Sequence, residues 1–256
     1  MPEKLTIDHE VELSRLQVQL SKDYLDSDAS KKLLNEIDIN GIGRSQTHIF
    51  AMLSELRSIC NHPVLVNEDW SMAHVRAEDS AKLAFLEELL DEVVAGEHRA
   101  PLFCRSTQDA PDPRTIPERM GDQVPATRRQ HPDRRQRLVD QFNSSPDITI
   151  FLLSMAGSSG INLTSADTVI FSDHDWNPAN DAQAMDRAYR IGQKKDVTVY
   201  RLVSKGTIEE RILERQHAKQ SLADEVIGAD AAGFKDFTKE ELMGLFRLDS
   251  GDQNGL

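Results

Sequence analysis

Two arginines stand three residues apart in the sequence DRAYRIGQ, at Arg187 and Arg190. The spacing predicts that both lie inside the start of a helix closed by Gly192, with their guanidiniums on one face. A planar, permanently charged guanidinium suits a phosphate whose negative charge grows in a transition state. The pair therefore indicates phosphoryl-transfer chemistry. The alternative is that both arginines are surface ion-pair partners of Asp181 and Asp186.

A glycine-rich turn precedes the arginines, between two short apolar runs. Ile148 to Leu153 and Asp167 to Phe171 have the continuous apolar character of buried parallel strands. Between them lies AGSSG, with Gly157 and Gly160, which would let backbone amides approach a phosphate or a sugar closely. An ordinary turn between strands is the alternative. Two polar side chains that would add hydrogen bonds follow the turn: Asn162 and Thr164.

Apolar spacing predicts the helices of the N-terminal half. A polar helical stretch from Leu16 to Ile37 is followed by an expected loop from Asp38 to Arg44, which contains two glycines. The segment His48 to Cys60 has the apolar spacing of a helix, and Pro63 ends it. An amphipathic helix is expected from Ala81 to Val94.

Two further helices are expected near the C-terminus. One runs from Thr207 to Asp224 and begins with two glutamates, which interact favourably with the helix dipole. The other lies within Phe237 to Phe246, where Thr238 and Glu241 have the spacing of a capping box.

Length and composition favour a folded protein outside membranes. The chain has 256 residues, of which 39% are hydrophobic, enough for one large domain with helical extensions. The apolar runs are too short to span a bilayer, and the first ten residues lack the apolar core of a signal peptide. Cys60 and Cys104 lie far apart without ligand spacing, so neither a disulfide framework nor a zinc site is expected.

The net charge of −13 at first argues against a nucleic-acid partner. Two segments are nevertheless basic. Arg99 to Arg137 contains nine arginines against five carboxylates, and Asp181 to Lys219 contains nine lysines and arginines against six carboxylates. An acidic protein can contact a phosphate backbone if such segments share one surface, whereas the alternative is that both are ordinary solvated faces.

The order of the motifs resembles a known family. AGxxGxNLTxAxxVI, DHDWNP, QAMDRAxRIGQ and VxVYRLVxxGTIEExI follow one another almost without gaps from about Ile148 to Lys219. Scattered matches, such as CNHP, SAKLAFLEELLDEV and PLFCRST, extend over most of the chain. The chain is similar to the carboxy-terminal RecA-like lobe of Swi/Snf-type ATP-dependent DNA translocases, the chromatin-remodelling branch of the superfamily-two helicases. The resemblance implies an α/β fold, with a parallel sheet flanked by helices and helical N- and C-terminal extensions.

The resemblance also implies roles for individual residues. Arg187 and Arg190 are implied as arginine fingers that reach the γ-phosphate of ATP. The residues implied to line the nucleotide are Gly157, Gly160, Asn162 and Gln183. The residues implied to contact nucleic acid are Ser158, Thr164, Trp176, Arg128 and Arg129. No metal ligand is implied in this chain, because ATP and Mg²⁺ would be held mainly by another lobe. For Trp176, a buried ring beside a turn is the alternative.

Residues 105–137 depart from the family pattern. Five prolines stand where the family has a long helix followed by a strand, and prolines at that density exclude a regular helix. We therefore expect an irregular segment that has lost a core helix. Two milder departures are Ser158 in place of a loop glycine and Tyr189 in place of a common histidine, and neither removes an arginine.

The chain lacks the motifs that would hold a triphosphate. Neither GxxxxGK[ST] nor a DExH box is present. Alone, the chain is not expected to hydrolyse ATP, and it would supply half of a DNA-dependent ATPase. Three functions stay open: the second lobe of a translocase that moves along double-stranded DNA or remodels protein–DNA complexes, a non-enzymatic nucleic-acid or partner-binding module, and a truncated, inactive gene product.

The resemblance implies an organisation and a set of partners. Residues 1–66 would end the first lobe and form an interlobe helical segment, residues 80–220 would form the helicase C-terminal lobe, and residues 221–256 a helical tail. The implied partners are a first RecA-like lobe, upstream or in trans, double-stranded DNA, and DNA-bound proteins such as histones, transcription factors or RNA polymerase. The expected location is intracellular, in the nucleus of a eukaryote or in the cytoplasm with the nucleoid of a bacterium.

Overall fold

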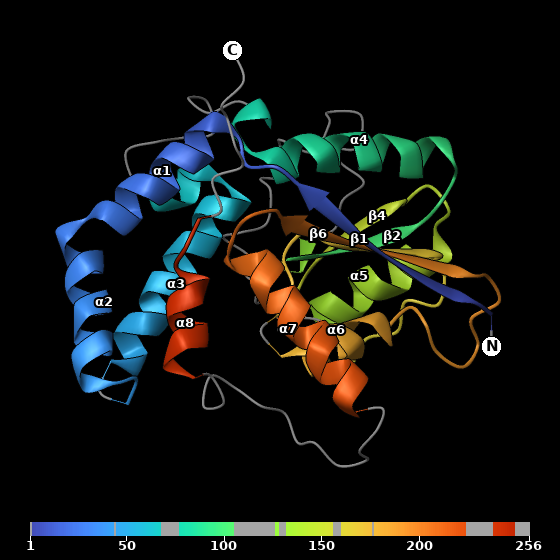
Figure 1. Cartoon of the computed structure of the whole chain (residues 1–256). Coiled ribbons are helices and arrows are strands. Elements are labelled where there is room, and N and C mark those ends of the chain that lie inside the picture. Colours follow the sequence, from blue (N-terminus) through green and yellow to red (C-terminus); the bar gives the residue numbers. More distant parts are fainter. Residues whose placement is uncertain are drawn as a thin grey trace. The chain divides into compact units, whose positions relative to one another are not determined.

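The structure, a computed structural model, describes residues 2–43, 45–67, 77–104, 126–127, 132–155, 160–175, 177–223 and 238–248. The chain forms two compact units, and each unit is built from two separate stretches of sequence. The first unit comprises residues 1–10 and 82–203, and the second comprises residues 11–81 and 204–256. Figure 1 labels the helices and strands of both units.

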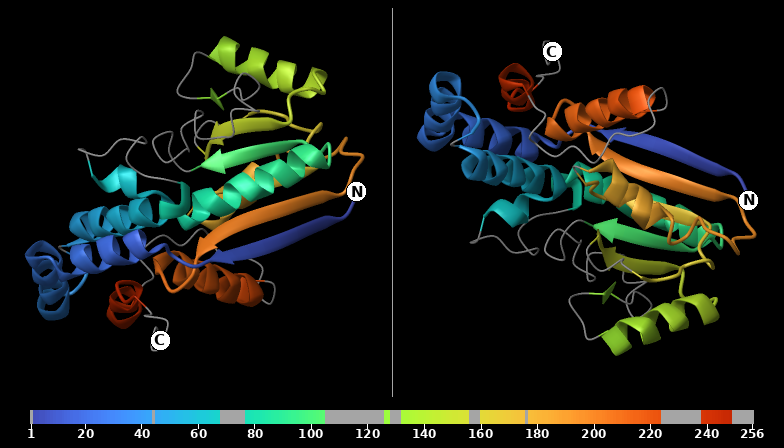
Figure 2. Two further views of the ribbon diagram at one scale, coloured as in Figure 1. Left: turned by 90° about the horizontal axis from the view of Figure 1, so that it is seen from above. Right: turned by 90° about the horizontal axis from the view of Figure 1, so that it is seen from below.

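Within the described residues, the sheet has six strands in the order β1-β6-β5-β2-β4-β3. The strands are β1 (Lys4–Val11), β2 (Ala100–Cys104), β3 (Ala126–Thr127), β4 (Ile150–Ser154), β5 (Thr168–Phe171) and β6 (Val197–Ser204). The pairs β3 with β4, β4 with β2, β2 with β5 and β5 with β6 are parallel. In Figure 2 the arrows of β1 and β6 also point the same way. The predicted parallel sheet is confirmed.

Helices cover both faces of this sheet, and successive residues of its strands face opposite sides. On one face, strand side chains pack with α5 (Pro132–Ser144) and α6 (Pro178–Met185), in a cluster that includes Phe103, Phe142, Phe151, Phe171 and Ala184. On the other face, the strands pack with α4 (Ala81–Ala95), in a cluster that includes Leu86, Leu90, Leu102, Ile150 and Leu202. Figure 1 shows α4 on the opposite side of the sheet from α5 and α6. This layered α/β arrangement is the one that the sequence predicts.

Strand β1 forms one edge of the sheet, beside β6. The Arg201 guanidinium on β6 forms an ion pair with Asp8, in which Nη2 lies 2.8 Å from Oδ2. The imidazole of His9 stacks on the ring of Phe85 from α4, with 3.6 Å between ring centroids. These contacts attach the N-terminal residues to elements that lie far away in the sequence.

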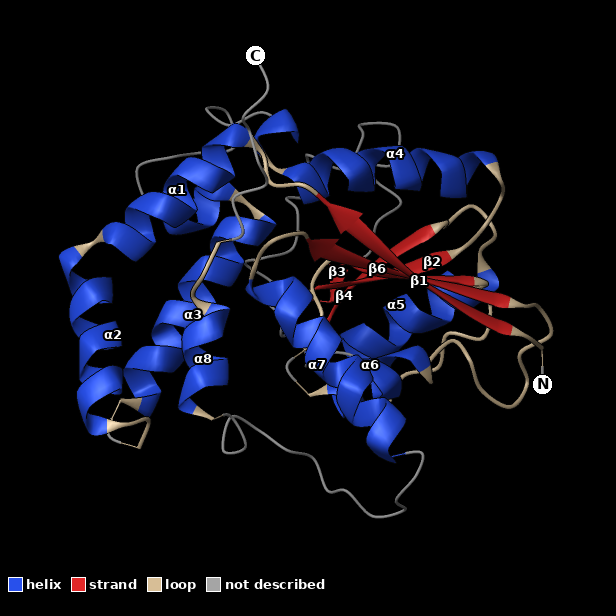
Figure 3. Cartoon of the chain, in the orientation of Figure 1, coloured by secondary structure: helices blue, strands red, loops and turns tan. Residues whose placement is uncertain are grey.

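The second unit consists mainly of helices, drawn in blue in Figure 3. They are α1 (Arg15–Asp26), α2 (Asp28–Asn40), α3 (Gln46–Asn61), the short helices η1 (Pro63–Val66) and η2 (Ala77–Asp79), α7 (Ile208–Ala223) and α8 (Lys239–Leu245). The helices expected at 48–60, 81–94 and 207–224 are confirmed within a few residues. The capping box of Thr238 and Glu241 is also confirmed, since each side chain accepts a backbone N–H of the other residue.

The stretch expected as one helical segment at 16–37 is two helices that meet at Ser27. The Ser27 hydroxyl accepts the N–H of Ser30 and donates to the carbonyl of Tyr24, so it caps the end of α1 and the start of α2. Helix α2 then continues to Asn40 and stops at Gly41, whose φ of 75° lies in the left-handed region. The loop expected from Asp38 therefore begins three residues later.

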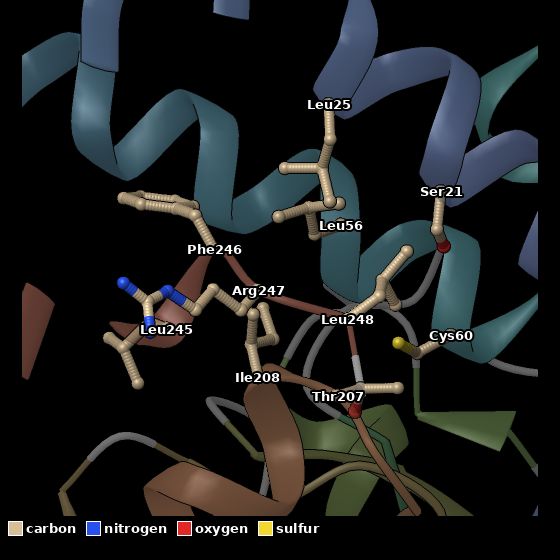
Figure 4. A pocket seen from close by; sticks show the side chains of 10 residues that line it. All are labelled: Ser21, Leu25, Leu56, Cys60, Thr207, Ile208, Leu245, Phe246, Arg247 and Leu248. Carbon is tan, nitrogen blue, oxygen red and sulfur yellow. The ribbon is translucent and has the colours of Figure 1, made fainter. Parts of the chain in front are cut away.

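A small pocket lies within the second unit. Figure 4 shows that its lining comes from α1, α3, the start of α7 and the end of α8. The lining is mostly apolar and includes Leu25, Leu56, Ile208 and Leu245. Over the described residues, no helix combines the length and the apolar character needed to cross a membrane.

Candidate functional site

Helix α6 ends before the two arginines. The Asn177 side chain caps its start by accepting the N–H of Ala179 at 3.0 Å, and Asp186 is its C-cap. Arg187 and Arg190 follow in a non-helical turn, so the prediction that they lie inside a helix is wrong. We call residues 186–193 the arginine segment.

The backbone of the arginine segment is joined to the loop between β4 and β5. The N–H of Leu163 donates to the carbonyl of Arg187 at 2.8 Å. The N–H groups of Ala188 and Tyr189 both return to the carbonyl of Met185, at 3.0 and 2.9 Å. A tight turn therefore replaces the helix, because the Arg187 carbonyl is used by another part of the chain.

Gln193 fixes the far end of the arginine segment. Its buried side chain donates from Nε2 to the carbonyls of Ala166 (2.7 Å) and Ala188 (3.1 Å). Its Oε1 accepts the N–H groups of Lys194 (2.8 Å) and Lys195 (2.9 Å). This residue was missed as a functional candidate. The one signal in the sequence is its place directly after Gly192, whose φ of 105° sharply turns the chain.

A buried aspartate, Asp167, holds the residues that follow the arginine segment. Asp167, which directly precedes β5, accepts from Lys195 Nζ at 2.8 Å and from the Arg99 N–H at 3.0 Å, and His98 Nδ1 lies 3.4 Å from its carboxylate. Burial raises the pKa of Asp167, but these hydrogen bonds and the Lys195 charge outweigh it and hold the pKa below its usual value. The residues after the arginine segment are thus attached to the sheet by a charged group.

The two arginine side chains differ in exposure. Arg190 is exposed, and the neighbouring Ile191 is 90% exposed. Arg187 is half-buried, and its buried Nε has no hydrogen-bond partner among the described residues. Since a buried guanidinium N–H without a partner is costly, this atom is a candidate for contact with an anionic group from outside the described residues.

The proposed surface ion pairs of the arginines are not found within the described residues. Asp181 is only 2% exposed, and its Oδ1 accepts the N–H of Asp175 at 3.0 Å. Its Oδ2 has no hydrogen-bond partner in the described part of the chain. Burial, together with the charges of Asp175 and Asp173, raises the pKa of Asp181 to about 7. Asp181 therefore connects α6 to the DHDWNP loop.

Three of the predicted site residues lie on the loop that contains Leu163. Gly160 has a φ of 76°, a backbone conformation that favours glycine. Asn162 is exposed, and its carbonyl accepts Nδ2 of Asn143 at 2.7 Å, while Thr164 is half-buried. The Leu163–Arg187 hydrogen bond brings this loop against the arginine segment. Gln183 is exposed on α6, one turn before Arg187.

The remaining predicted site residues lie outside the described residues: Gly157, Ser158, Trp176, Arg128 and Arg129. Most of the segment 105–137, expected to be irregular, also lies outside them, apart from β3 and the start of α5. No group of three or more His, Cys, Asp or Glu side chains in the described residues is arranged to hold a metal ion.

Comparison with known proteins places this geometry in a family. Residues 81–192 match the helicase conserved C-terminal domain. The C-terminal domain of the SWI2/SNF2 ATPase of Sulfolobus solfataricus superimposes with a TM-score of 0.70 at 25% identity, covering 96% of this chain and 99% of that one. The chain is related to the C-terminal lobe of the Swi2/Snf2 ATPases. This match over 96% of the chain confirms the resemblance that the motifs indicate.

Longer relatives contain a region that is similar to this chain. The Sulfolobus solfataricus ATPase core in complex with double-stranded DNA matches with a TM-score of 0.75 at 27% identity, over 96% of this chain and 51% of that one. The yeast (Saccharomyces cerevisiae) TATA-binding protein-associated factor MOT1 is 36% identical over 98% of this chain, and the human TATA-binding protein-associated factor 172 is 34% identical over 97%. The chain spans 16% of the length of each of these two relatives.

Proposed function

We propose that this chain acts as the second lobe of an ATP-dependent translocase on double-stranded DNA. In this proposal it supplies Arg187 and Arg190 as arginine fingers to an ATP molecule held by a first lobe. The observation that carries the proposal is Arg187, whose buried Nε has no hydrogen-bond partner among the described residues. The family of the lobe supplies the reaction class, since its solved relatives are ATPases.

The residues of the lobe fit a nucleotide phosphate. A polyanion would provide acceptors for Arg187 Nε and for the exposed guanidinium of Arg190. Gly160, Asn162 and Gln183 lie on the loop and helix that flank the arginine segment, and none of them is buried. In this proposal ATP and Mg²⁺ are held mainly by the first lobe.

In the mechanism, the arginines offset charge that grows during hydrolysis. ATP bound with Mg²⁺ provides the phosphoryl group that water attacks. Arg187 and Arg190 place positive charge beside the developing negative charge, and the short turn positions them before the reaction begins. Gln193 and the Leu163–Arg187 hydrogen bond keep that turn in one conformation. Arginine fingers of this kind accelerate hydrolysis by roughly 10³–10⁵-fold.

The same lobe would contact DNA through the loop that precedes β5. Thr164 lies on this loop next to Leu163, so a DNA contact there would be linked through one backbone hydrogen bond to Arg187. Ser158, Trp176, Arg128 and Arg129 are the other proposed contacts. Proteins already bound to DNA, such as transcription factors or histones, are the proposed objects of the translocase. The proposed location is the nucleus in a eukaryote, or the cytoplasm with the nucleoid in a bacterium.

The proposal is tested by combining the chain with a first lobe that carries a phosphate-binding loop, either fused or in trans. ATP hydrolysis should then appear and rise with double-stranded DNA, and Arg187→Ala should reduce kcat at least about 10³-fold. Arg15→Ala removes an exposed arginine from the second unit and is the matched control, with no expected loss. Full hydrolysis by Arg187→Ala would contradict the proposal.

A second candidate is a module that binds nucleic acid without hydrolysing ATP. The absence of the phosphate-binding loop from this chain and its two basic segments favour it. DNA binding that weakens with salt but is indifferent to ATP and to Arg187→Ala would support this function over the first. Failure of both DNA binding and ATP hydrolysis would leave an inactive gene product.

A further inference from the structure

The first residues of the chain contact the arginine segment through Tyr189. The hydroxyl of Tyr189 donates to the carbonyl of Pro2 at 2.8 Å. The Lys4 ammonium lies 5.5 Å from the centroid of the same ring, within the range of a cation–π interaction. Tyr189 stands between Arg187 and Arg190, so these contacts reach the middle of the arginine segment.

The same N-terminal residues are also held at the start of β6. The N–H of Glu3 donates to Asp196 Oδ1 at 2.8 Å, and the carbonyl of Glu3 accepts the N–H of Val197 at 3.0 Å. Residues 2–4, which we call the N-terminal segment, therefore contact the chain both within the arginine segment and just after it. Figure 2 shows the start of β1 beside the start of β6.

The arginine segment depends on such contacts because it has no regular structure of its own. After Met185, its backbone is fixed by a tight turn, by Leu163 and by the side chain of Gln193. Gln193 acts from the buried side, where it reaches the carbonyl of Ala188. Tyr189 is partly buried against the core, and within the described residues its hydroxyl provides the one side-chain hydrogen bond from positions 187–190 to the N-terminal segment.

We propose that Tyr189 is a positioning residue, whose hydrogen bond to the Pro2 carbonyl fixes the orientation of Arg187 and Arg190. The N-terminal segment then helps to hold the arginine segment in place. The consequence for hydrolysis rests on the proposed function of the arginines. The consequence for the conformation of the arginine segment does not. The sequence pattern alone could not reveal this role, because the hydrogen bond joins Pro2 and Tyr189, which are 187 positions apart.

The main variant is Tyr189→Phe, which keeps the ring against the core and above Lys4 and removes only the hydroxyl. Amide hydrogen exchange of residues 187–192 should become faster in the full 256-residue chain, while exchange in β4 and β5 stays unchanged. In the complex with a first lobe, kcat should fall about fivefold and KM for ATP should stay within about twofold, because the arginines act mainly in the transition state.

A second variant separates positioning from simple stabilisation. Asp196→Ala removes the acceptor of the Glu3 N–H and should loosen the same N-terminal segment, with a similar fall in kcat. If both substitutions act by releasing the N-terminal segment, combining them should add no further loss. The kcat of the double variant should then lie within about twofold of the kcat of the slower single variant. Tyr200→Phe is the matched control, because its half-buried ring lies on β6 and its hydroxyl has no hydrogen bond among the described residues.

The outcomes distinguish this proposal from the proposed function. Unchanged exchange at 187–192 and unchanged kcat in Tyr189→Phe, with a large loss in Arg187→Ala, would overturn the positioning role and leave the arginine fingers intact. A lower unfolding temperature with normal kcat per folded molecule would also overturn it, since the hydroxyl would then be merely structural. Faster exchange in Tyr189→Phe with no effect of Arg187→Ala on hydrolysis would confirm the placement of the segment and refute the arginine fingers.

Discussion

The backbone N–H of Leu163 donates a hydrogen bond to the carbonyl of Arg187, at 2.8 Å. This one bond joins the glycine-containing loop after β4 to the segment that carries both arginines. Since it is made by backbone atoms, its existence depends on the shape of both loops and not on a particular side chain at either position. Changes that alter the loop or the turn should therefore affect the arginines without touching them.

Gln193 is the side chain on which the shape of the turn depends most. Gln193→Ala should lower the free energy of unfolding by about 2–3 kcal/mol, because two carbonyls and two N–H groups lose their partner. Chemical denaturation followed by circular dichroism measures this change. Gln136→Ala removes an exposed glutamine that contacts Asp140 on α5 and should cost less than about 0.5 kcal/mol. Equal effects of the two substitutions would contradict the role of Gln193.

Asp181 should make the protein less stable as the pH rises. Its pKa is about 7 in the folded chain against an ordinary value of 3.8, so the folded state binds more protons between these values. The stabilising contribution of the protonated form is complete below 3.8 and is lost as the pH rises through about 7. Asp181→Asn keeps an oxygen for the Asp175 N–H and removes the charge, so it should raise stability at pH 8 by at least ~1 kcal/mol and change it little at pH 4.

Unfolding of Asp181→Asn and wild type measured across this pH range tests the prediction. Asp186→Asn neutralises an exposed aspartate at the end of the same helix and should show no comparable gain at pH 8. A constant difference between wild type and Asp181→Asn at every pH would mean that the carboxyl does not titrate in this window.

The contribution of Asp167 to the stability of the fold should depend on pH in the opposite direction to that of Asp181. Its pKa is held below 3.8, so its contribution is present above that value and is lost as the pH falls through the folded pKa. Asp167→Asn should cost about 2 kcal/mol at pH 7, where the carboxylate accepts hydrogen bonds from the Lys195 ammonium and from the backbone N–H of Arg99. In acid the difference from wild type should shrink, and thermal unfolding at pH 7 and pH 3 measures it. A cost that grows in acid would be inconsistent with an ionised Asp167.

The variant Gly160→Ala tests whether the loop after β4 requires a left-handed backbone conformation at this position. A Cβ at this position would meet no atom within 4 Å, so the cost of Gly160→Ala comes from its φ of 76° alone. We expect a loss of about 1 kcal/mol in the free energy of unfolding. Gly43→Ala is the matched control, because Gly43 also has open space around it but does not have a positive φ. If both variants are equally stable, the loop does not require the left-handed conformation.

Local patterns predicted most of the regular elements. Continuous apolar runs identified β4 and β5, and apolar spacing identified α3, α4 and α7, because burial on one or both faces fixes the periodicity of such segments. The paired arginines were found by their type and spacing. Their conformation was not, because the Arg187 carbonyl bonds to Leu163, a tertiary contact that no local pattern contains.

Long-range contacts explain the other differences. The partner of β1 is β6, so Asp8 pairs with Arg201, 193 positions away, and no local pattern contains this pairing. Asp181 looks like a surface charge in the sequence, and only the packing of α6 shows that it is 2% exposed. The boundary between α1 and α2 at Ser27 had a local signal, since serine is a preferred N-cap. The polar residues on both sides of Ser27 nevertheless resemble one continuous helical stretch.

The placement of β1 at the sheet edge limits how the lobe can be divided. A fragment consisting of residues 81–192, the range of the family match, would stop before β6 and leave one side of β5 without a neighbour. Extending it through β6 but not back to residue 4 would uncover β6 instead. Bare strand edges recruit other chains, so a soluble fragment of this unit should include both the first residues and β6.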